Sequence, residues 1–264
     1  MIPEPRLATT MCVLAPGDDG ILVLMVRRSA AMRFMPGAWV FPGGVIDPED
    51  DARADIAVPG VADDHRAWAA AGVREVMEET GIWLSPEPVV VPVGDRPAGG
   101  DIQRLVERYG PVEGTAVHHL STWITPTAVP VRFHTRFSVI GVDHAVDGEP
   151  DGIEVDLVAW LDPATTISAG DAGEVALPLP TRHTLAGFAA LGSVDAVLGA
   201  AQTGTPPVVQ PRLRLDGDVM VALLPGDEGY EDIPELAPDP DTLSRVVEVR
   251  GADGRPVPEL GRPR

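Results

Sequence analysis

The sequence predicts a single domain of the α/β (α+β) class, a sandwich of strands and helices. Apolar, β-prone runs are interspersed with helical stretches, and one short strand leads through a Gly-Gly loop into a long helix. The chain has 264 residues, of which 44% are hydrophobic. A chain of this length and composition can build one substantial core.

The N-terminal part is expected to form a hairpin of core strands. Residues 9–14 and 21–26 are apolar and β-prone, and the Pro- and Gly-containing segment 16–20 separates them as a turn. A loop with several arginines follows over residues 27–37. It leads to a short strand at 38–41, which ends at a Pro-Gly-Gly sequence.

Two stretches, at about 47–63 and 85–120, lack a clear period and are expected to be surface insertions, the second with a short helix near 101–109. The segment between them is expected to be helical. Its start is predicted at Asp63 or Asp64, which can cap a helix, and its end near Thr80, where Gly81 provides a stop signal.

The second half continues the alternation of strands and helices. The elements expected there are strands at 123–127, 131–142 and 153–160, a helix over 181–201 that is broken near Gly192-Ser193, and a hairpin over 213–224. One domain should therefore cover residues 1–250. The Gly- and Pro-rich tail, 251–264, is expected to be disordered.

Composition excludes several classes of protein. The formal net charge of -20 is opposite in sign to that of most nucleic-acid-binding proteins. No window approaches the length of a membrane span, and the N-terminus lacks the pattern of a signal peptide. The single cysteine, Cys12, fits a reducing compartment. We therefore expect a soluble, cytoplasmic protein that binds neither nucleic acid nor membrane.

The most informative stretch is Arg74 to Ile82, which reads Arg-Glu-Val-Met-Glu-Glu-Thr-Gly-Ile. On a helix, Glu75, Glu78 and Glu79 share about a third of the circumference. Their like charges repel one another, so a cation should offset the repulsion, and Mg²⁺ with substrate phosphates fits best. The opposite side forms a core face made of Ala69, Ala70, Val73, Val76 and Met77.

The helical projection also places Ala71 and Gly72 next to the carboxylates, where small residues would leave room for a metal ion and phosphate oxygens. The Gly43-Gly44 loop upstream can approach a ligand closely and offer carbonyl oxygens to a metal ion. An acidic helix face that is simply solvated is the competing interpretation. The glycine loop favours a metal site.

Together these residues resemble the Nudix box, whose pattern opens with Gly and ends with Arg-Glu-apolar-x-Glu-Glu-x-Gly-apolar. Gly44 opens it here, and residues 74–82 match the second half at every defined position. In the first half, Asp50 stands where the pattern has Glu, and 23 residues instead of seven precede Arg74. An insertion therefore splits the box, and Asp64 is a second candidate for the missing Glu.

The resemblance implies a Nudix-type α/β/α sandwich with a mixed central sheet, and hydrolysis of a diphosphate bond in a nucleotide derivative. It implies Mg²⁺, with Mn²⁺ as a substitute, held by Glu75, Glu78, Glu79 and the carbonyl of Gly44, with Arg74 orienting the carboxylates. The general base stays open. The candidates are Glu78, Glu79 and the later acid Glu154.

A second resemblance covers the segment just before the box. Residues 24–44 are similar to the signature of coenzyme A diphosphatases and match it at Arg28, Ser29, Arg33, Gly37 and Phe41 to Gly44. Met25 and Val26 depart from it. Coenzyme A carries a 3′-phosphate besides its diphosphate, so forked contacts from arginines are expected. The candidate substrate-binding residues are Arg27, Arg28, Arg33, Arg132 and Arg136.

This branch predicts coenzyme A or acyl-CoA as substrate, with 3′,5′-ADP and (acyl-)phosphopantetheine as products. Two alternatives stay open: a Nudix hydrolase of ADP-ribose, NADH or another nucleoside diphosphate derivative, and a Nudix-fold binding or regulatory module without catalysis. The altered first half of the box keeps the last alternative open. Nudix enzymes often form dimers, so a homodimer is a further expectation from the resemblance.

Overall fold

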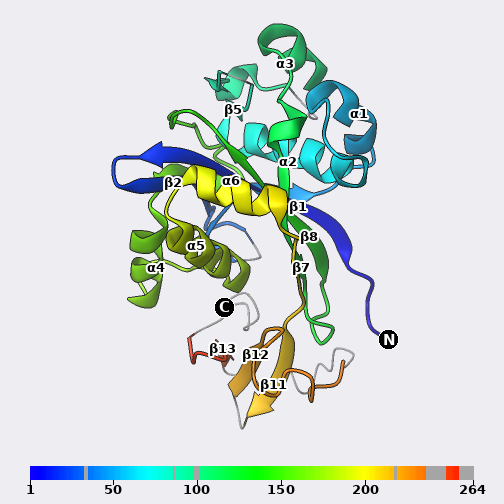
Figure 1. Ribbon diagram of the computed structural model, residues 1–264, viewed down its shortest axis with the longest axis vertical. Coiled ribbons are helices and arrows are strands. Elements are labelled where there is room, and N and C mark those ends of the chain that lie inside the picture. The colour runs from blue at the N-terminus through cyan, green and yellow to red at the C-terminus, as the bar shows by residue number, and fades with distance from the viewer. Residues whose placement is uncertain (33–34, 86, 98–101, 217–218, 236–247, 256–264) are drawn as a thin grey trace.

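The computed structural model describes residues 1–32, 35–85, 87–97, 102–216, 219–235 and 248–255. It confirms the expected α/β/α sandwich, with a mixed central sheet between two layers of helices. Figure 1 shows α1, α2 and α3 gathered at one end of the long axis and a small separate sheet at the other end.

The central sheet has eight strands. Its main path has the order β10-β7-β8-β1-β2-β3, while β4 pairs with β1 and β9 pairs with β2. The pairs β1–β8 and β7–β10 are parallel, and the others are antiparallel. The strands are β1 (Arg6–Gly17), β2 (Gly20–Arg28), β3 (Trp39–Val40), β4 (Gly43–Val45), β7 (His118–Ile124), β8 (Phe133–Gly141), β9 (Val155–Leu161) and β10 (Val208–Val209).

Helices cover both faces of this sheet because alternate residues of β1 are apolar toward each side. Met11 and Val13 pack with α2 (Arg66–Thr80) in one core cluster. Cys12 and Leu14 pack on the other face with α5 (Leu179–Leu191) and α6 (Val194–Thr203). The predicted break between these two helices is confirmed, because Gly192 ends α5 with a φ of 73°.

Smaller elements surround α2. The segment 47–63, expected to be a surface insertion without a clear period, contains α1 (Asp50–Ala57), which buries Ala54 and Ala57 against α2. The 3₁₀ turn η1 (Asp63–His65) then precedes α2. The segment 85–120 holds the expected helix, α3 (Ile102–Tyr109). The remaining short elements here are β5 (Ile82–Trp83), β6 (Val89–Val90), η2 (Val93–Asp95) and η4 (Gly114–Ala116).

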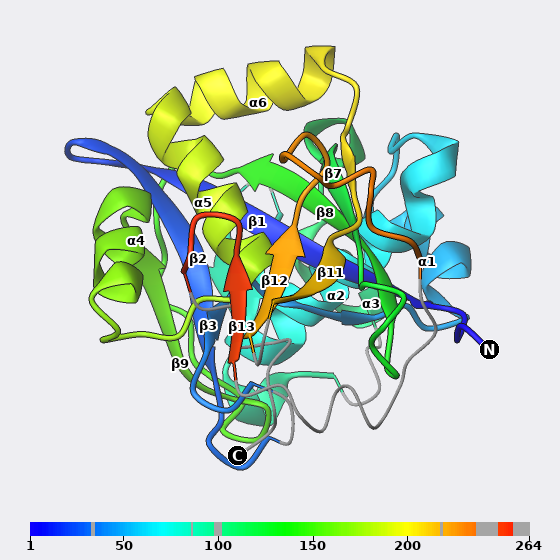
Figure 2. The same ribbon diagram turned by 90° about the horizontal axis from the view of Figure 1, so that it is seen from below.

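The C-terminal part forms a second, three-stranded sheet of β11 (Arg212–Asp216), β12 (Val219–Leu223) and β13 (Glu248–Gly251). The first two strands are the predicted late hairpin, and β13 was not predicted. Seen from below, this sheet stands in front of the main sheet, with β13 beside α5 (Figure 2). Helix α4 (Pro163–Asp171) was also missed. Asp162 caps it by accepting a hydrogen bond from the Thr165 amide.

Among the described residues, no single helix has the length and apolar composition to cross a membrane, whereas the pair α5 and α6, bent by 111°, meets the test by length and composition alone. Residues 256–264, most of the predicted disordered tail, lie outside the described residues.

Candidate active site

Helix α2 presents its core face to the sheet and an acidic face to a cavity. The five predicted core residues are fully buried in one cluster, as the helical period requires. The helix ends where Gly81 adopts a φ of 71°, a conformation that favours glycine, and its amide donates to the Met77 carbonyl. Glu75, Glu78 and Glu79 all line the cavity.

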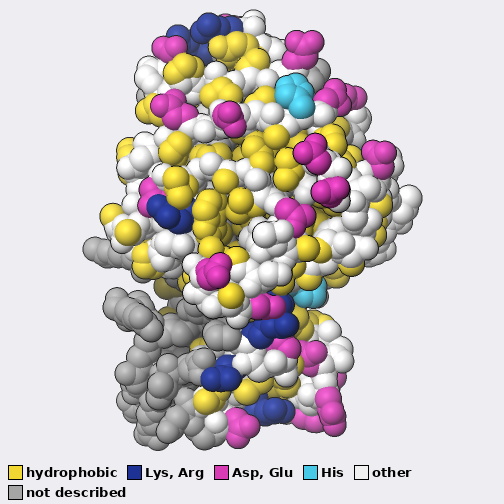
Figure 3. All heavy atoms as spheres, turned by 90° about the vertical axis from the view of Figure 1, so that its left-hand side faces the viewer, with side chains coloured by type: hydrophobic (Ala, Val, Ile, Leu, Met, Phe, Trp, Pro, Cys, Tyr) yellow, Lys and Arg dark blue, Asp and Glu magenta, His cyan; other side chains and the backbone are white. Residues whose placement is uncertain are grey.

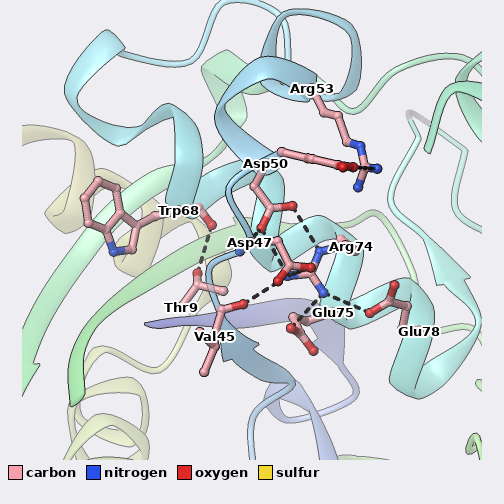
Figure 4. Close-up of polar contacts among 10 residues, drawn as sticks. Thr9, Val45, Asp47, Asp50, Arg53, Trp68, Arg74, Glu75 and Glu78 are labelled. Carbon is pink, nitrogen blue, oxygen red and sulfur yellow. Dashed lines mark hydrogen bonds and ion pairs between the residues drawn. The ribbon is translucent and has the colours of Figure 1, made fainter. Parts of the chain in front are cut away.

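Arg74 lies at the centre of the acidic cluster and is only 4% exposed. Its Nη1 donates to the carboxylates of Glu75 and Glu78, both at 2.9 Å, and its Nη2 donates to the Val45 carbonyl at 3.1 Å. Figure 4 shows the guanidinium pointing between the glutamates of α2 and two earlier acids, Asp47 and Asp50. Arg74 thus fixes two of the three glutamates relative to strand β4.

Asp50, at the start of α1, holds the other side of the guanidinium. Its two carboxylate oxygens accept from Nε and Nη2 of Arg74 at 3.0 and 3.1 Å, in a fork-shaped pair. Asp50 is completely buried. The second candidate for the missing Glu, Asp64, is exposed in η1 and does not line the cavity. The geometry therefore places Asp50, not Asp64, with Arg74.

The Gly43-Gly44 pair brings the backbone of β4 against the acidic ridge. The Gly43 amide donates to a carboxylate oxygen of Glu79 at 3.2 Å. A Cβ atom on Gly44 would collide with the Glu75 carboxylate, and one on Gly43 would collide with the backbone of Thr9. Only glycine permits this approach, so the Gly44 backbone and the Glu75 carboxylate lie side by side.

Burial and mutual repulsion change the acidity of the ridge. Burial raises the pKa of Glu75 to about 7, although Arg74 opposes the rise. The pKa of Glu79 is raised well above its usual value by burial and then by the charge of Glu75, and burial also raises that of Glu78. Arg74 alone therefore does not compensate the negative charge of the three carboxylates, and a bound cation would supply the missing positive charge.

The oxygen donors suit a hard divalent cation. Carboxylates from one helical ridge face a glycine backbone that has no side chain in the way, which is the cradle such an ion needs. Within the described part of the chain, no three acidic, His or Cys side chains are already spaced around one ion position. Nη1 of Arg74 bridges Glu75 and Glu78 instead. The residues fit a cation by their chemistry and not as a preformed cage.

The cavity in front of the ridge has a volume of about 1750 Å³. One part of its wall is charged, with the acids of α2, Arg74 and Arg28. The rest is mostly apolar and comes from loops, from strands β7 and β8 and from the first turn of α5. The apolar lining includes Met32, Met35, Val129, Val131, Trp123 and Leu179.

Glu154, the candidate base, lines this cavity from the loop before β9. Asp151 holds the loop, because its Oδ1 accepts from the amides of Ile153, Glu154 and Val155 at 2.9 to 3.1 Å. Asp151 was missed in the sequence. The Asp-Gly turn followed by Glu154 was the only local signal for such a capped loop.

The candidate arginines separate into two groups. Arg28 lines the cavity. Arg27 points away and pairs with Asp156 at 2.7 Å. Arg132 donates to the carbonyls of Pro3 and Thr125, and Arg136 lies over the ring of Trp68. Neither Arg132 nor Arg136 lines the cavity.

The separation follows from strand geometry, because successive side chains of β8 point to opposite faces. Phe133, Thr135 and Phe137 face the cavity, so Arg136 faces the other layer. The structure thus does not bring Arg27, Arg132 or Arg136 to the site. Arg33 lies outside the described residues.

The expected role of Gly72 also differs. A Cβ atom there would lie 2.7 Å from the methyl carbon of Met11, so Gly72 faces β1 and not the carboxylates. Its lack of a side chain lets α2 approach the sheet. Ala71, also predicted beside the carboxylates, is fully buried and does not line the cavity.

Comparison with known proteins assigns this architecture to a family. The family model described as NUDIX domain matches residues 5–166. The chain is 28% identical to acyl-coenzyme A diphosphatase NUDT19 of Homo sapiens over 278 residues, covering 81% of this chain and 74% of the relative. It is also 28% identical to a Caenorhabditis elegans protein named nudix hydrolase 7, over 80% of this chain and 70% of that protein.

Among solved structures, a NUDIX hydrolase from Alicyclobacillus acidocaldarius superposes with a TM-score of 0.68 and 26% identity, over 78% of this chain and all of that one. The matched segment contains Gly44, the acids of α2 and Glu154, which line the cavity, and also Asp50, which pairs with Arg74. The chain belongs to the Nudix family and is a hydrolase that acts on diphosphate bonds.

Proposed function

We propose that this enzyme hydrolyses the diphosphate of coenzyme A or acyl-CoA in the presence of Mg²⁺, giving 3′,5′-ADP and phosphopantetheine or its acylated form. The observation that carries this proposal is the cavity, in which an acidic ridge continues into a long apolar wall. Its volume of about 1750 Å³ exceeds the roughly 300–1,000 Å³ of common ligand pockets. Acyl-CoA combines a diphosphate with a pantetheine arm and a hydrocarbon chain.

The similarity to human acyl-coenzyme A diphosphatase NUDT19 supports the same substrate class. So does the resemblance of residues 24–44 to the coenzyme A diphosphatase signature. From that segment, Arg28, Met32, Met35 and Gly44 all line the cavity. Arg28 would contact a substrate phosphate through its fork of N–H donors.

The metal ligands in this proposal are Glu75, Glu78, Glu79 and the Gly44 carbonyl. Nudix hydrolases generally use divalent cations, and Mg²⁺ prefers such oxygen ligands, with Mn²⁺ as a substitute. When bound, the ion would lower the pKa of water and neutralise phosphate charge. Arg74, fixed by Asp50, keeps Glu75 and Glu78 oriented toward the cavity.

Glu154 is the base that we assign. It lines the same cavity as the acidic ridge, on a loop held by Asp151, and its charge acts on both Glu75 and Glu79. It would accept a proton from the attacking water. The water oxygen then forms the new P–O bond, and the bridging oxygen leaves with the other phosphate. Glu78 and Glu79 are the other candidates for the base, but this proposal already uses both as metal ligands.

The test is a substrate panel. The purified chain is incubated with Mg²⁺ and coenzyme A, octanoyl-CoA, ADP-ribose or NADH, and the products are separated by chromatography. We expect 3′,5′-ADP from the first two substrates, and none when EDTA is added or when Glu78→Gln is used. Turnover of ADP-ribose or NADH at a far higher kcat/KM than any coenzyme A derivative would overturn the proposal.

A further inference from the structure

The first turn of α5 lines the cavity and also packs against the C-terminal sheet. It lies beyond the segment matched by the family model. Pro178, Leu179, Pro180 and Thr181 line the cavity, whereas the match ends at residue 166. The Nudix segment supplies the acids, and this later segment supplies part of the wall. This part of the wall therefore lies outside the segment that matches the family.

Leu179 connects three parts of the molecule. It packs against the core cluster between the main sheet and α5, and also against Met220, Ala222 and Val249 of the small sheet. Within the described part of the chain, it is the one residue that packs against both of these clusters. Because it also lines the cavity, the small sheet supports this part of the wall from behind.

Ion pairs fasten the same region. Arg182, about one helical turn after Leu179 on α5, pairs with Asp171 at the end of α4 at 2.9 Å. Arg255, after β13, pairs with the same carboxylate at 3.1 Å and with Asp253 at 2.9 Å. The end of β13 is therefore tied to both α4 and α5. Helices α4 and α5 pack against each other, and β13 lies beside α5 in the view of Figure 2.

We infer that Leu179 is a specificity-determining residue, which contacts the hydrocarbon part of the substrate and favours acylated over free coenzyme A. This inference rests on the proposed function. Leu179 thus contributes to substrate preference, while the acidic ridge carries out hydrolysis. An apolar side chain in a cavity wall stabilises an apolar ligand by removing its surface from water.

The test compares the kcat/KM of octanoyl-CoA with that of free coenzyme A. Leu179→Ala should lower this ratio about tenfold, because a loss of a few methylene contacts has that size. Leu179→Met conserves side-chain volume and should keep most of the ratio of the unmodified chain. Leu213→Ala is the matched control, since Leu213 packs against the same small-sheet cluster but does not line the cavity. It should leave the ratio unchanged.

The inference fails if Leu179→Ala leaves the ratio within twofold of that of the unmodified chain, or if Leu213→Ala lowers it equally. Absence of any coenzyme A hydrolysis would instead refute the proposed function. Leu179 is then still tested by binding, because apolar contact needs no turnover. Calorimetry with octanoyl-CoA should show a dissociation constant about tenfold higher for Leu179→Ala than for Leu213→Ala, and equal constants would overturn the inference.

Discussion

Arg74 and Arg136 both lie against helix α2, but in opposite chemical surroundings. Arg74 is surrounded by carboxylates from α1 and α2 at the wall of the cavity. Arg136 lies 4.0 Å over the ring of Trp68 and donates to the Asp64 carbonyl, and its Nε is buried without a hydrogen-bond partner. The first arginine organises charge, whereas the second packs against aromatic rings.

The comparison shows that an arginine's role depends on the face of the element that carries it. Arg136 alternates with Thr135 and Phe137, which line the cavity, so a shift of one residue along β8 would reverse its position. Next to Arg136 and Trp68, His65 stacks on His119 with ring centroids 5.0 Å apart. None of these four side chains, which we call the outer cluster, lines the cavity. The two regions should therefore respond differently to substitution.

The largest effect is expected from Glu78→Gln. Glutamine keeps the size and the acceptor for Arg74 but removes the charge that a divalent cation would bind, so kcat should fall at least about 1000-fold, or about 4 kcal/mol. Glu107→Gln, on the surface helix α3, is the matched control and should not change kcat. Comparable activity of Glu78→Gln and the control with Mg²⁺ would contradict a metal site on this ridge.

The next effect is expected from Asp50→Ala. It leaves the buried Arg74 without its fork-shaped partner, and breaking a buried pair costs about 3 kcal/mol of unfolding free energy. Urea unfolding measures the loss. Asp51→Ala removes the neighbouring acid, which is exposed, and should change stability little. Equal destabilisation by the two substitutions would show that Asp50 does not hold Arg74.

A smaller effect should come from pH in the outer cluster. Burial, followed by the charges of His119 and Arg136, lowers the pKa of His65 from 6.5 to about 3. Between about pH 6.5 and pH 3, His65 is protonated in the unfolded chain but neutral in the folded chain. The contribution of neutral His65 to the free energy of unfolding is therefore complete above pH 6.5 and is lost as pH falls toward 3. Between pH 7.5 and pH 5 this loss is about 2 kcal/mol.

Urea unfolding of the unmodified chain and of His65→Gln at both pH values isolates this contribution, since the glutamates of the ridge are present in both proteins. His65→Gln should show a smaller loss of stability on acidification. An identical pH dependence of the two proteins would mean that His65 is protonated equally in the folded and unfolded states.

The smallest effect is expected from Arg136→Met, which removes the cation–π contact with Trp68 and should cost about 1 kcal/mol of stability. Its KM for coenzyme A should stay within twofold of the unmodified value. Arg28→Met is the matched comparison in the cavity and should raise KM about tenfold, through loss of a phosphate contact. A higher KM for Arg136→Met than for Arg28→Met would reverse the assignment of the two regions.

The sequence predicted the features that depend on local period and on glycine. The five core residues of α2 follow from the helical period, its stop at Gly81 follows from a single glycine, and the close approach of the Gly-Gly loop follows from the motif. The helical character of 50–57 did not show, because α1 is short and exposes most of its polar surface. The position of Asp50 could be read from the motif, but its complete burial could not.

What sequence could not supply is the pairing between distant elements. Arg132 and Arg136 were predicted to bind substrate, but the sequence does not state which face of the sheet meets the cavity. Figure 3 views the molecule from a third side, where apolar side chains gather above the small sheet. That the small sheet supports the wall through Leu179 depends on contacts between residues more than 40 positions apart.

Asp50 and Arg74 are 24 positions apart along the chain but only 3.0 Å apart in space. Searches that demand a fixed number of residues between the halves of the motif would therefore overlook enzymes built in this way. A helix can be inserted between two partners, and even lengthened, provided that both of its ends return to the same contact. Membership in a family with such insertions is better defined by which side chains contact one another than by their separation in the sequence.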